Sequence, residues 1–384
     1  MIFAIITGAL IISLANAQLC PLVFNKQHGE CRDSCDGFGT LDTSLNILGC
    51  LGRQCCIPDP ANIPTTVEPE DTTTTMTTTT QSSSGPTVNP ATECGMAPTT
   101  PTTRILQGSM TKPCDWPWQI SVRSRIIGTD EISPANTFPW CSGVLIDNQW
   151  VLTTAYCVIL SVGTVTGVIE NNILAVAGEY NTKEADFSGT EYNEKFIKVV
   201  DAIVHPEYFK NDPSTYTGAD LLDSDDDKTS NNFALLKLET PLEFGDCIRK
   251  VCTPLMEDCW TKKECKIAGW GNKNAANIGE ISDELLSADI MVYSPAVCEA
   301  VYGIEFNETG PMKELTTCAK AVNPETNVCL GDNGGMVVCK NEKGKWTVEG
   351  LINRPNHEQC DPGSLFLVSY VKPAMEWIKS VTGI

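Results

Sequence analysis

The sequence has 384 residues, enough for one large domain and a smaller module. Its 27 Lys and Arg against 48 Asp and Glu give a formal net charge of −21. That balance argues against sequence-independent binding to nucleic acid or anionic membranes, because both require clustered basic residues. A hydrophobic content of 42% can supply a core, and 19 cysteines indicate an oxidising compartment. We therefore expect a secreted, extracellular protein.

The first residues have the pattern of a signal peptide. The stretch from Ile2 to Leu14 is almost wholly apolar, and Ala15-Asn16-Ala17 forms a small-x-small cleavage site. The apolar run is too short to span a bilayer, which takes about 20 residues as a helix. We expect residues 1–17 to be removed and the mature protein to have no membrane span.

Residues 18–56 form a cysteine-rich module. A segment this short buries little core, so three disulfides would have to hold it. The order of its cysteines resembles the clip modules in front of arthropod-type serine proteases, and equally the framework of β-defensins and big defensins. Cysteine order alone does not select one connectivity, and both interpretations stay open. The six cysteines are Cys20, Cys31, Cys35, Cys50, Cys55 and Cys56.

Residues 57–103 are predicted to be an extended linker. They contain 16 Thr and 8 Pro and no Lys or Arg, so the segment has little to bury. The tract from Thr72 to Thr80 has the composition of an O-glycosylated stalk. An unmodified flexible tether explains the same composition.

From Ile105 onward, short β-rich runs alternate with turns, which predicts antiparallel barrels or sandwiches. The end of the chain differs, because Pro373 can start a helix. Residues on one face of that helix would be Ala374, Trp377, Ile378 and Val381. The prediction is an all-β domain with a C-terminal helix.

Six motifs in this region occur in the order of the chymotrypsin-like serine proteases. They are "RILQG" (Arg104 to Gly108), "WPWQISV" (Trp116 to Val122), "WVLTTAYC" (Trp150 to Cys157), "NNFALLKL" (Asn231 to Leu238), "AGWG" (Ala268 to Gly271) and "CLGDNGGM" (Cys329 to Met336). The resemblance covers nearly all of residues 105–384. It implies two six-stranded antiparallel β-barrels with a cleft between them.

The resemblance also implies a disulfide pattern. The implied pairs are Cys141–Cys157, Cys265–Cys339, Cys298–Cys318, Cys329–Cys360 and Cys94–Cys252. The last pair would keep the front module attached after cleavage at Arg104. Cys114, Cys247 and Cys259 remain, and because three is odd, at least one is free or bonded to another chain.

All three positions of the catalytic triad depart from the family. Tyr156 stands where the family has His, Asn232 where it has Asp, and Asn333 where it has the nucleophilic Ser. The Asn333 amide cannot be activated as a hydroxyl can, and Tyr156 is a poor proton acceptor at neutral pH. Asn232 carries no charge to stabilise an imidazolium. We therefore expect no useful peptide hydrolysis.

The remaining histidines offer little substitute for the missing base. His28 lies in the front module, and His205 stands in "IVHPEY", a turn that active relatives also carry. His357 could approach the cleft, but no Ser or Cys nucleophile is recognisably paired with it. No cofactor or metal is expected.

The substrate groove is altered as well. By resemblance, Asn327 lies at the base of the primary specificity pocket, where trypsin-like members carry Asp. Asn353, Arg354 and Pro355 replace the Ser-Trp-Gly segment that pairs with substrate backbone. Pro355 has no N–H to donate. Peptide docking is expected to be compromised along with catalysis.

The activation junction is retained. Arg104-Ile105 is a basic-then-apolar junction, and Asp332 stands where the family's Asp pairs with the new amino terminus. One hypothesis is that cleavage after Arg104 exposes a binding surface without creating an enzyme. The alternative is that these residues only preserve the geometry of the fold.

Two further features lie outside these motifs. Asn307-Glu308-Thr309 is an N-glycosylation sequon, which implies a glycoprotein with Asn307 on its surface if the sequon is used. The insertion between Asp220 and Asp227 is strongly acidic. It suggests binding to calcium or to a basic partner, or a solvated loop, and its spacing does not match an EF-hand.

The resemblance implies a non-catalytic serine protease homologue that acts as a cofactor or decoy in an extracellular protease cascade or in innate immunity. Its partners would be cascade components or zymogens, and microbial surfaces. Two other functions compete with this one. They are a structural component of an extracellular matrix, and an active protease with an unconventional site.

Overall fold

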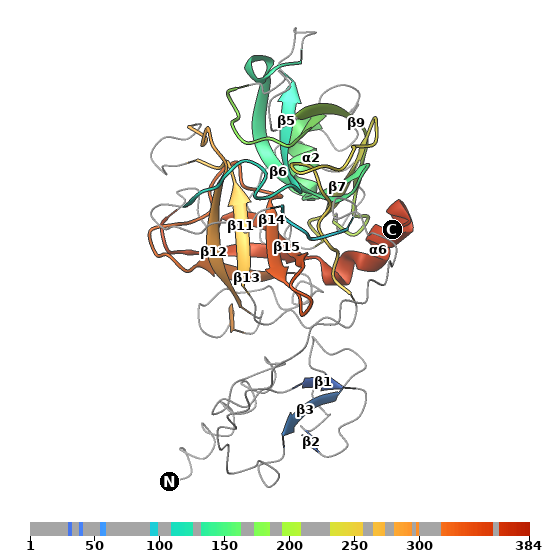
Figure 1. The fold of residues 1–384 in the computed structure, drawn as a ribbon, viewed down its shortest axis with the longest axis vertical. Coiled ribbons are helices and arrows are strands. Elements are labelled where there is room, and N and C mark those ends of the chain that lie inside the picture. The colour runs from blue at the N-terminus through green and yellow to red at the C-terminus, as the bar shows by residue number, and fades with distance from the viewer. Residues whose placement is uncertain are drawn as a thin grey trace, which may run out of the picture. The chain divides into compact units, whose positions relative to one another are not determined.

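A computed structural model describes the chain over residues 30–32, 38–40, 54–58, 93–98, 109–125, 132–162, 173–184, 194–208, 231–255, 264–272, 280–293, 297–298, 316–355 and 361–384. The chain divides into two compact units, Met1–Pro90 and Ala91–Ile384 (Figure 1). The second unit begins inside the stretch predicted as a linker, because residues 93–98 pack on the domain that follows. None of the helices within the described residues is long and apolar enough to cross a membrane.

The first unit contains a three-stranded antiparallel sheet. Its strands are β1 (Glu30–Arg32), β2 (Phe38–Thr40) and β3 (Gln54–Pro58), in the order β1-β3-β2. The register places Cys31 opposite Cys55 and Thr40 opposite Cys56. The side chains of the six front cysteines lie outside the described part of the structure, so the choice between clip and defensin pairing is still a prediction.

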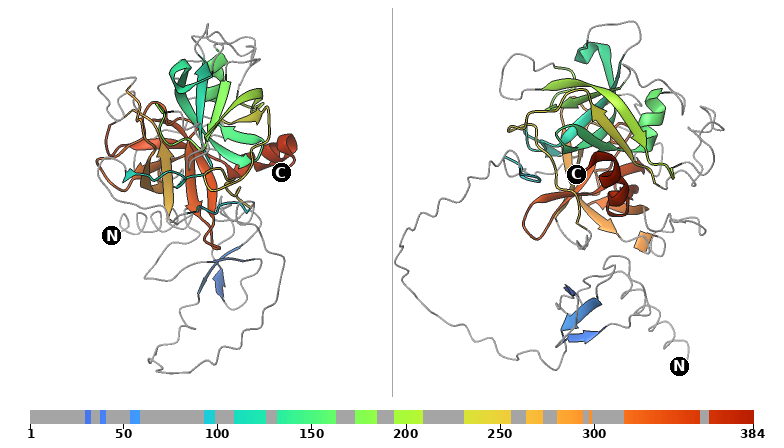
Figure 2. Two further views of the ribbon diagram at one scale, coloured as in Figure 1. Left: turned by 45° about the horizontal axis from the view of Figure 1, so that its top comes forward. Right: turned by 90° about the vertical axis from the view of Figure 1, so that its right-hand side faces the viewer.

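The second unit begins with a closed barrel of six antiparallel strands, in the order β10-β7-β6-β5-β8-β9. The strands are β5 (Gln119–Arg125), β6 (Thr137–Asp147), β7 (Trp150–Thr153), β8 (Ile173–Ala177), β9 (Lys195–Val204) and β10 (Ala234–Leu238). β8 is buried along its whole length. Figure 2 shows this barrel from two further sides.

The second barrel uses strands from the C-terminal half. They are β11 (Cys265–Gly269), β12 (Leu286–Tyr293), β13 (Thr316–Ala321), β14 (Met336–Lys340), β15 (Trp346–Pro355) and β16 (Leu365–Tyr370). The order is β11-β14-β15-β16-β13-β12, and β11 pairs again with β12 to close the ring. The short β4 (Ser109–Met110) adds to β12. The predicted pair of six-stranded antiparallel barrels is confirmed.

The C-terminal helix is also confirmed. Pro373 lies in the 3-10 turn η5 (Lys372–Ala374), and α6 (Met375–Thr382) follows. Ile378 is fully buried, and Trp377 and Val381 pack partly buried against the core. Gly383 ends the helix with a φ of 77°, and its N–H donates to the carbonyl of Lys379.

A second helix was not predicted, because the run "WVLTTAYC" continues a strand pattern. Here β7 ends at Thr153 and α2 (Ala155–Val162) begins two residues later. The N–H groups of a first helical turn have no partner within the helix. The N–H of Tyr156 finds one in Oδ1 of Asn232, 3.0 Å away and far along the chain. A further short 3-10 turn, η2 (Pro134–Asn136), precedes β6.

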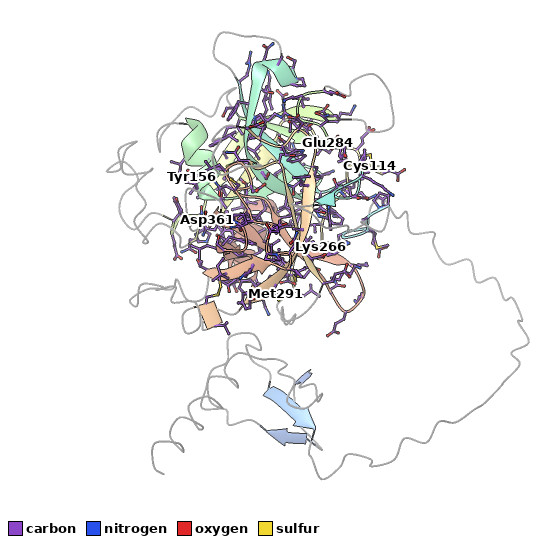
Figure 3. The ribbon with its side chains drawn as sticks, turned by 90° about the vertical axis from the view of Figure 1, so that its left-hand side faces the viewer. Cys114, Tyr156, Lys266, Glu284, Met291 and Asp361 are labelled. Atoms are coloured by element: carbon purple, nitrogen blue, oxygen red, sulfur yellow. A yellow bond between two sulfur atoms is a disulfide. The ribbon has the colours of Figure 1, made fainter. Side chains whose placement is uncertain are left out.

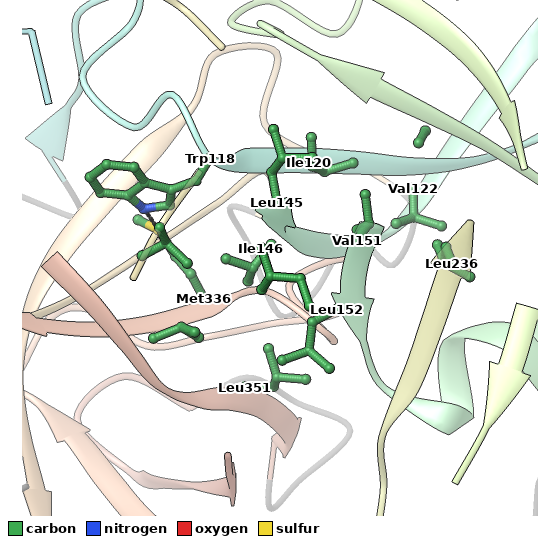
Figure 4. Packing of buried hydrophobic residues seen from close by; sticks show 14 of the residues in the cluster. Trp118, Ile120, Val122, Leu145, Ile146, Val151, Leu152, Leu236, Met336 and Leu351 are labelled. Carbon is green, nitrogen blue, oxygen red and sulfur yellow. Dashed lines mark hydrogen bonds between the residues drawn. The ribbon is translucent and has the colours of Figure 1, made fainter. Parts of the chain in front are cut away.

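The two barrels share one core. Trp118 before β5 is fully buried, and its Nε1–H donates to Sδ of Met336, the first residue of β14, over 3.2 Å (Figure 4). Around this contact pack Leu145 and Leu152 of the first barrel and Leu351 of the second. Because interiors are packed as densely as organic crystals, this shared core fixes one barrel against the other.

Five disulfides lie wholly within the described residues. Four are pairs that the resemblance implies: Cys94–Cys252, Cys141–Cys157, Cys265–Cys339 and Cys298–Cys318. The fifth joins Cys114 and Cys247, whose Cα atoms are 4.2 Å apart, so two of the three leftover cysteines pair with each other. Cys329 is also disulfide-bonded. Its expected partner Cys360, and Cys259, are outside the described residues.

Candidate functional site

The three altered triad positions come together where the barrels meet. Tyr156 is on α2 at the edge of the first barrel (Figure 3), and Asn232 comes two residues before β10. Asn333 stands in the loop before β14, with its carbonyl oxygen 3.4 Å from Sγ of Cys157, the neighbour of Tyr156. The backbone N–H of Ser142 in β6 donates to the same carbonyl over 2.8 Å.

Asn232 is held at both ends of its side-chain amide. Its Oδ1 accepts the N–H of Tyr156, and its Nδ2 donates to Oδ1 of Asn353 over 2.6 Å. Asn232 and Asn353 are both 2% exposed. The amide is therefore a buried connector between the barrels, and it brings no charge into the site.

Asn333 is 4% exposed, yet its side-chain amide makes no hydrogen bond to any described residue, and Oδ1 is completely covered. The backbone next to Asn333 is held by a hydrogen bond and by close contacts at Gly334. The N–H of Gly334 donates to the carbonyl of Ile352 over 2.8 Å. Gly334 has a φ of 77°, and a Cβ there would collide with Thr153 and with the carbonyl of Ser142. The loop geometry thus needs glycine next to Asn333.

The Asp332 side chain is buried and is bonded to backbone N–H groups of the second barrel. Its Oδ1 accepts the N–H of Gly271 over 2.8 Å, and its Oδ2 accepts the N–H of Cys329 over 2.9 Å. Burial raises the pKa of Asp332 to about 6, and these two hydrogen bonds offset part of that rise. A Cβ on Gly269 or Gly271 would collide with the carboxylate, so these two glycines leave room for its oxygens.

The expected specificity-pocket residue Asn327 uses its amide within the protein. Its Nδ2 lies 2.5 Å from the carbonyl oxygen of Asp361 and 2.7 Å from Oγ of Ser364, and its Oδ1 accepts the N–H of Val328. The side chain therefore ties together the loop that follows β13 and the segment before β16.

The backbones of Arg354 and Pro355 lie in β15 and pair with Leu367 and Phe366 of β16. The side chains of Arg354 and Pro355 are outside the described part. So are Arg104 and Ile105, Asn307, the acidic insertion of residues 220–227, and the histidines His28 and His357. What was predicted for these residues therefore stays a prediction.

His205 is packed as a structural residue. It is 8% exposed, and its ring lies 4.7 Å from that of Trp377 in α6. Its Nδ1 accepts the N–H of Glu207 over 3.2 Å. Burial lowers the pKa of His205, so the ring is neutral near pH 7 and engaged away from the triad positions.

A buried charged cluster in the first barrel was not predicted. Arg123 in β5 is fully buried and forms an ion pair with Glu179, which follows β8. The guanidinium also donates to the hydroxyls of Ser121 and Thr137. Burial raises the pKa of Glu179 to about 8, against the opposing effect of Arg123, and the neighbouring Glu194 raises it further. The one indication in the sequence is a charged residue, Arg123, within a strand that otherwise alternates apolar and polar residues.

Residues 93–98, near the start of the second unit, are anchored to the rest of that unit by more than one kind of bond. Gly95 exchanges backbone hydrogen bonds with two segments of the domain. The contacts are the Cys94–Cys252 disulfide, Gly95 N–H to the carbonyl of Lys250, Trp346 N–H to the carbonyl of Gly95, Arg249 Nη1 to the carbonyl of Met96, and the Lys345–Glu93 ion pair. The base of the linker is therefore part of the folded domain.

The chain has two barrels that share one core, with a glycine-rich loop between them. A comparison of the sequence with known protein families points to a family with this fold. The trypsin family profile matches residues 105–378. The chain belongs to the trypsin family. From the motifs quoted above we expect Tyr156, Asn232 and Asn333 to stand at that family's His, Asp and Ser positions.

Two curated relatives align with most of this chain but with only part of their own length. Ovochymase-2 of Mus musculus is 25% identical over 286 residues, which cover 72% of this chain and 40% of the relative. Serine protease filzig of Drosophila melanogaster is 28% identical over 304 residues, which cover 77% of this chain and 15% of the relative. The chain thus spans less than half the length of these two curated relatives.

Proposed function

We propose that this trypsin-family chain is a secreted, non-catalytic homologue that acts by binding, as a cofactor or decoy in an extracellular protease cascade or in innate defence. The observation that carries the proposal is the placement of Asn232. In this family the carboxylate at that position orients a histidine and stabilises its positive charge. The Asn232 amide instead bonds to Asn353 and to the backbone of Tyr156, and it is neutral.

The other two positions support the same conclusion. A tyrosine hydroxyl with an ordinary pKa near 10 is a poor proton acceptor at neutral pH, so Tyr156 does not replace an imidazole. The side chain of Asn333 has no hydroxyl to deprotonate. Removing such catalytic groups from a related triad costs about 2 × 10⁶ in turnover.

Cleavage after Arg104 would then regulate binding and not catalysis. Asp332 is a buried carboxylate that forms no ion pair within the described residues, and burial raises its pKa to about 6. The new amino terminus of Ile105 would supply a positive charge, which favours an ordered loop after cleavage. If Asp332 only maintains the fold, cut and uncut protein will bind a partner with equal affinity.

The expected partners are extracellular proteins such as cascade proteases or zymogens, and microbial surfaces. A matrix component is the second candidate, favoured by the net charge of −21 and the Thr-rich linker. Recovery of the native protein from insoluble matrix would favour the matrix role, whereas recovery from body fluid would favour the cascade role.

Catalysis is tested directly on purified full-length protein, cut after Arg104 by an immobilised arginine-specific protease that is then removed. We expect no turnover of peptide or ester substrates and no labelling by an active-site phosphonate. An active trypsin-family enzyme serves as the positive control. Turnover that disappears in Asn333→Ala would overturn the proposal and favour an unconventional active site.

A further inference from the structure

Two buried carboxyl groups flank the segment that connects β8 with β9. Glu179 follows β8 and Glu194 directly precedes β9, and the two strands pair between Ala177 and Lys195. The Glu179 side chain is 1% exposed, and Glu194 is 4% exposed. Glu194 acts electrostatically on Glu179, whose Oε2 pairs with the fully buried guanidinium of Arg123 in β5. Three ionisable groups are thus gathered away from water.

The charges of these three groups do not balance when all are ionised. An arginine guanidinium stays protonated in proteins. Ionising both glutamates would therefore bury two negative charges beside this one positive charge, and unbalanced buried charge is costly. The other hydrogen bonds of Arg123 go to neutral acceptors, which are the hydroxyls of Ser121 and Thr137 and the carbonyl of Thr182. The closed cluster is therefore favoured when one carboxyl group holds a proton.

Glu179 is the group that holds this proton. Burial raises the pKa of Glu179 to about 8, Arg123 opposes the rise, and Glu194 adds to it. In an opened segment Glu179 would be solvated and would return to its ordinary pKa of 4.5. The closed form therefore binds the proton more tightly than the open form does. Each pH unit between about 4.5 and 8 should increase the open population up to about tenfold, with a plateau above about pH 8.

The residues just after this carboxyl group form an inter-barrel seam, which consists of residues 180–183 and 282–285. The carbonyl of Tyr180 accepts the N–H of Leu285 over 3.0 Å, and the N–H of Thr182 donates to the carbonyl of Asp283 over 2.8 Å. Lys183 pairs with Asp283 at the exposed edge of the seam. The segment after β8 thus joins the first barrel to the residues before β12 of the second.

Arg123 connects the carboxyl groups with this seam. Its Nη2 donates to the carbonyl of Thr182 over 3.3 Å as well as to the carboxylate. On the far side of the seam, the N–H of Ser282 donates to the carbonyl of Gly271 over 3.2 Å, and the N–H of Gly271 donates to Oδ1 of Asp332. The seam therefore lies between the buried charges of the first barrel and the loop that carries Asp332.

We propose that Glu179, Glu194 and Arg123 form a proton-controlled clasp that holds the inter-barrel seam closed at pH 5 to 6 and lets residues 179–183 open as the pH rises towards 8. When Glu179 loses its proton, two like charges face each other in a site that excludes water, where their repulsion is strong. Opening the segment solvates one of them and relieves that repulsion. The clasp acts whether or not the chain is catalytic, so it goes beyond the function proposed above.

Hydrogen exchange of the full-length protein, measured by mass spectrometry between pH 5.5 and pH 7.5, tests the clasp. The fragments of interest carry the amides of Thr182 and Leu285. Each exchange rate is divided into that of the same fragment from unfolded protein at the same pH, which gives a protection factor. We expect both protection factors to fall at least about tenfold over this range. The amide of Val338 in the middle of β14 should stay more strongly protected at every pH, because the opening is local.

Three variants assign the effect to the clasp. Glu179→Gln keeps an acceptor for Arg123 and cannot lose a proton, so its protection factors should not change with pH. Glu194→Gln removes the neighbouring negative charge and should weaken the pH dependence. Glu184→Gln makes the same change at an exposed position and should reproduce the profile of the parent.

Protection factors of Thr182 and Leu285 that stay constant from pH 5.5 to pH 7.5 in the parent would overturn the clasp. So would a pH dependence that persists in Glu179→Gln. Equal protection of Thr182 and Val338 would show that the whole domain unfolds at once, which contradicts local opening. If Glu179→Gln does not fold, Glu194→Gln decides, because a parental pH dependence in that variant would overturn the role of the two carboxyl groups.

Discussion

Nδ2 of Asn232 donates to Oδ1 of Asn353 over 2.6 Å, and this bond crosses from the first barrel to β15 of the second. A carboxylate in place of Asn232 could not donate it, so the Asn353 amide would have to turn and present its own Nδ2. The two asparagines form a matched pair, which gives Asn232 a structural role at the junction of the barrels.

Asn232→Ala should lower the free energy of unfolding by about 2 kcal/mol. The change removes the acceptor of the Tyr156 N–H and the donor to Oδ1 of Asn353, and each lost hydrogen bond costs about 0.5–1.5 kcal/mol. Urea unfolding followed by tryptophan fluorescence measures the difference. Asn148→Ala, at an exposed position, should stay within about 0.5 kcal/mol of the parent, and an equal loss in both variants would contradict the structural role.

Placing the family's triad residues at the three positions should produce hydrolysis of a small ester, because the two barrels that carry these positions have the family's fold. The triple variant Tyr156→His, Asn232→Asp, Asn333→Ser, cut after Arg104, should hydrolyse an ester substrate at least about 10³-fold faster than the parent. Asn333→Ser alone should match the parent, since the serine has no base to activate it. Activity in the single variant, or an inactive triple variant with a parental melting temperature, would show that the prediction is wrong.

Glu179 should make the protein less stable as the pH rises. Its pKa is about 8 in the folded chain against 4.5 for an ordinary glutamate. The folded state therefore holds this proton more tightly than the unfolded state does. The contribution is most favourable below about pH 4.5 and is lost as the pH approaches about 8.

Glu179→Gln keeps an acceptor for Arg123 and removes the titration. Its free energy of unfolding should rise relative to the parent between pH 5 and pH 8, as measured by urea unfolding at several pH values. Glu184→Gln makes the same change at an exposed position and serves as the control for the loss of one charge. A difference between Glu179→Gln and the parent that does not change with pH would refute the assignment.

Gly271→Ala should destabilise the domain by about 1–3 kcal/mol, the usual cost of overpacking. Its new Cβ would collide with the Asp332 carboxylate. Gly245→Ala is the matched control, because a Cβ there meets no atom within 4 Å. Thermal melting of both variants measures the effect, and equal melting temperatures would contradict the tight fit around Asp332.

The fold was predictable because its signals are local. Short alternating runs, turn residues and six ordered motifs lead to two barrels, and Trp377 and Ile378 mark the buried face of α6. The assignment of Tyr156, Asn232 and Asn333 to the triad positions also comes from the motifs, and it stays a prediction. What could not be predicted depends on contacts between distant segments.

The pairing of Cys114 with Cys247 joins residues 133 positions apart, and no spacing rule reaches that far. The start of α2 depends in the same way on Asn232, 76 positions after Tyr156. The burial of Arg123 depends on Glu179, which the pairing of β5 with β8 brings within reach. In each case tertiary structure overrides the local pattern.

Gly95 and Cys94 join the end of the Thr-rich stretch to the edge of the second barrel through backbone pairing and a covalent bridge. If the peptide bond after Arg104 is hydrolysed, the amino-terminal fragment stays with the body of the molecule in a one-to-one ratio. Whatever that fragment binds is then held on the same molecule as the barrels, at an effective concentration set by the length of the linker. Processing in this protein would alter how its two parts cooperate, without releasing either of them.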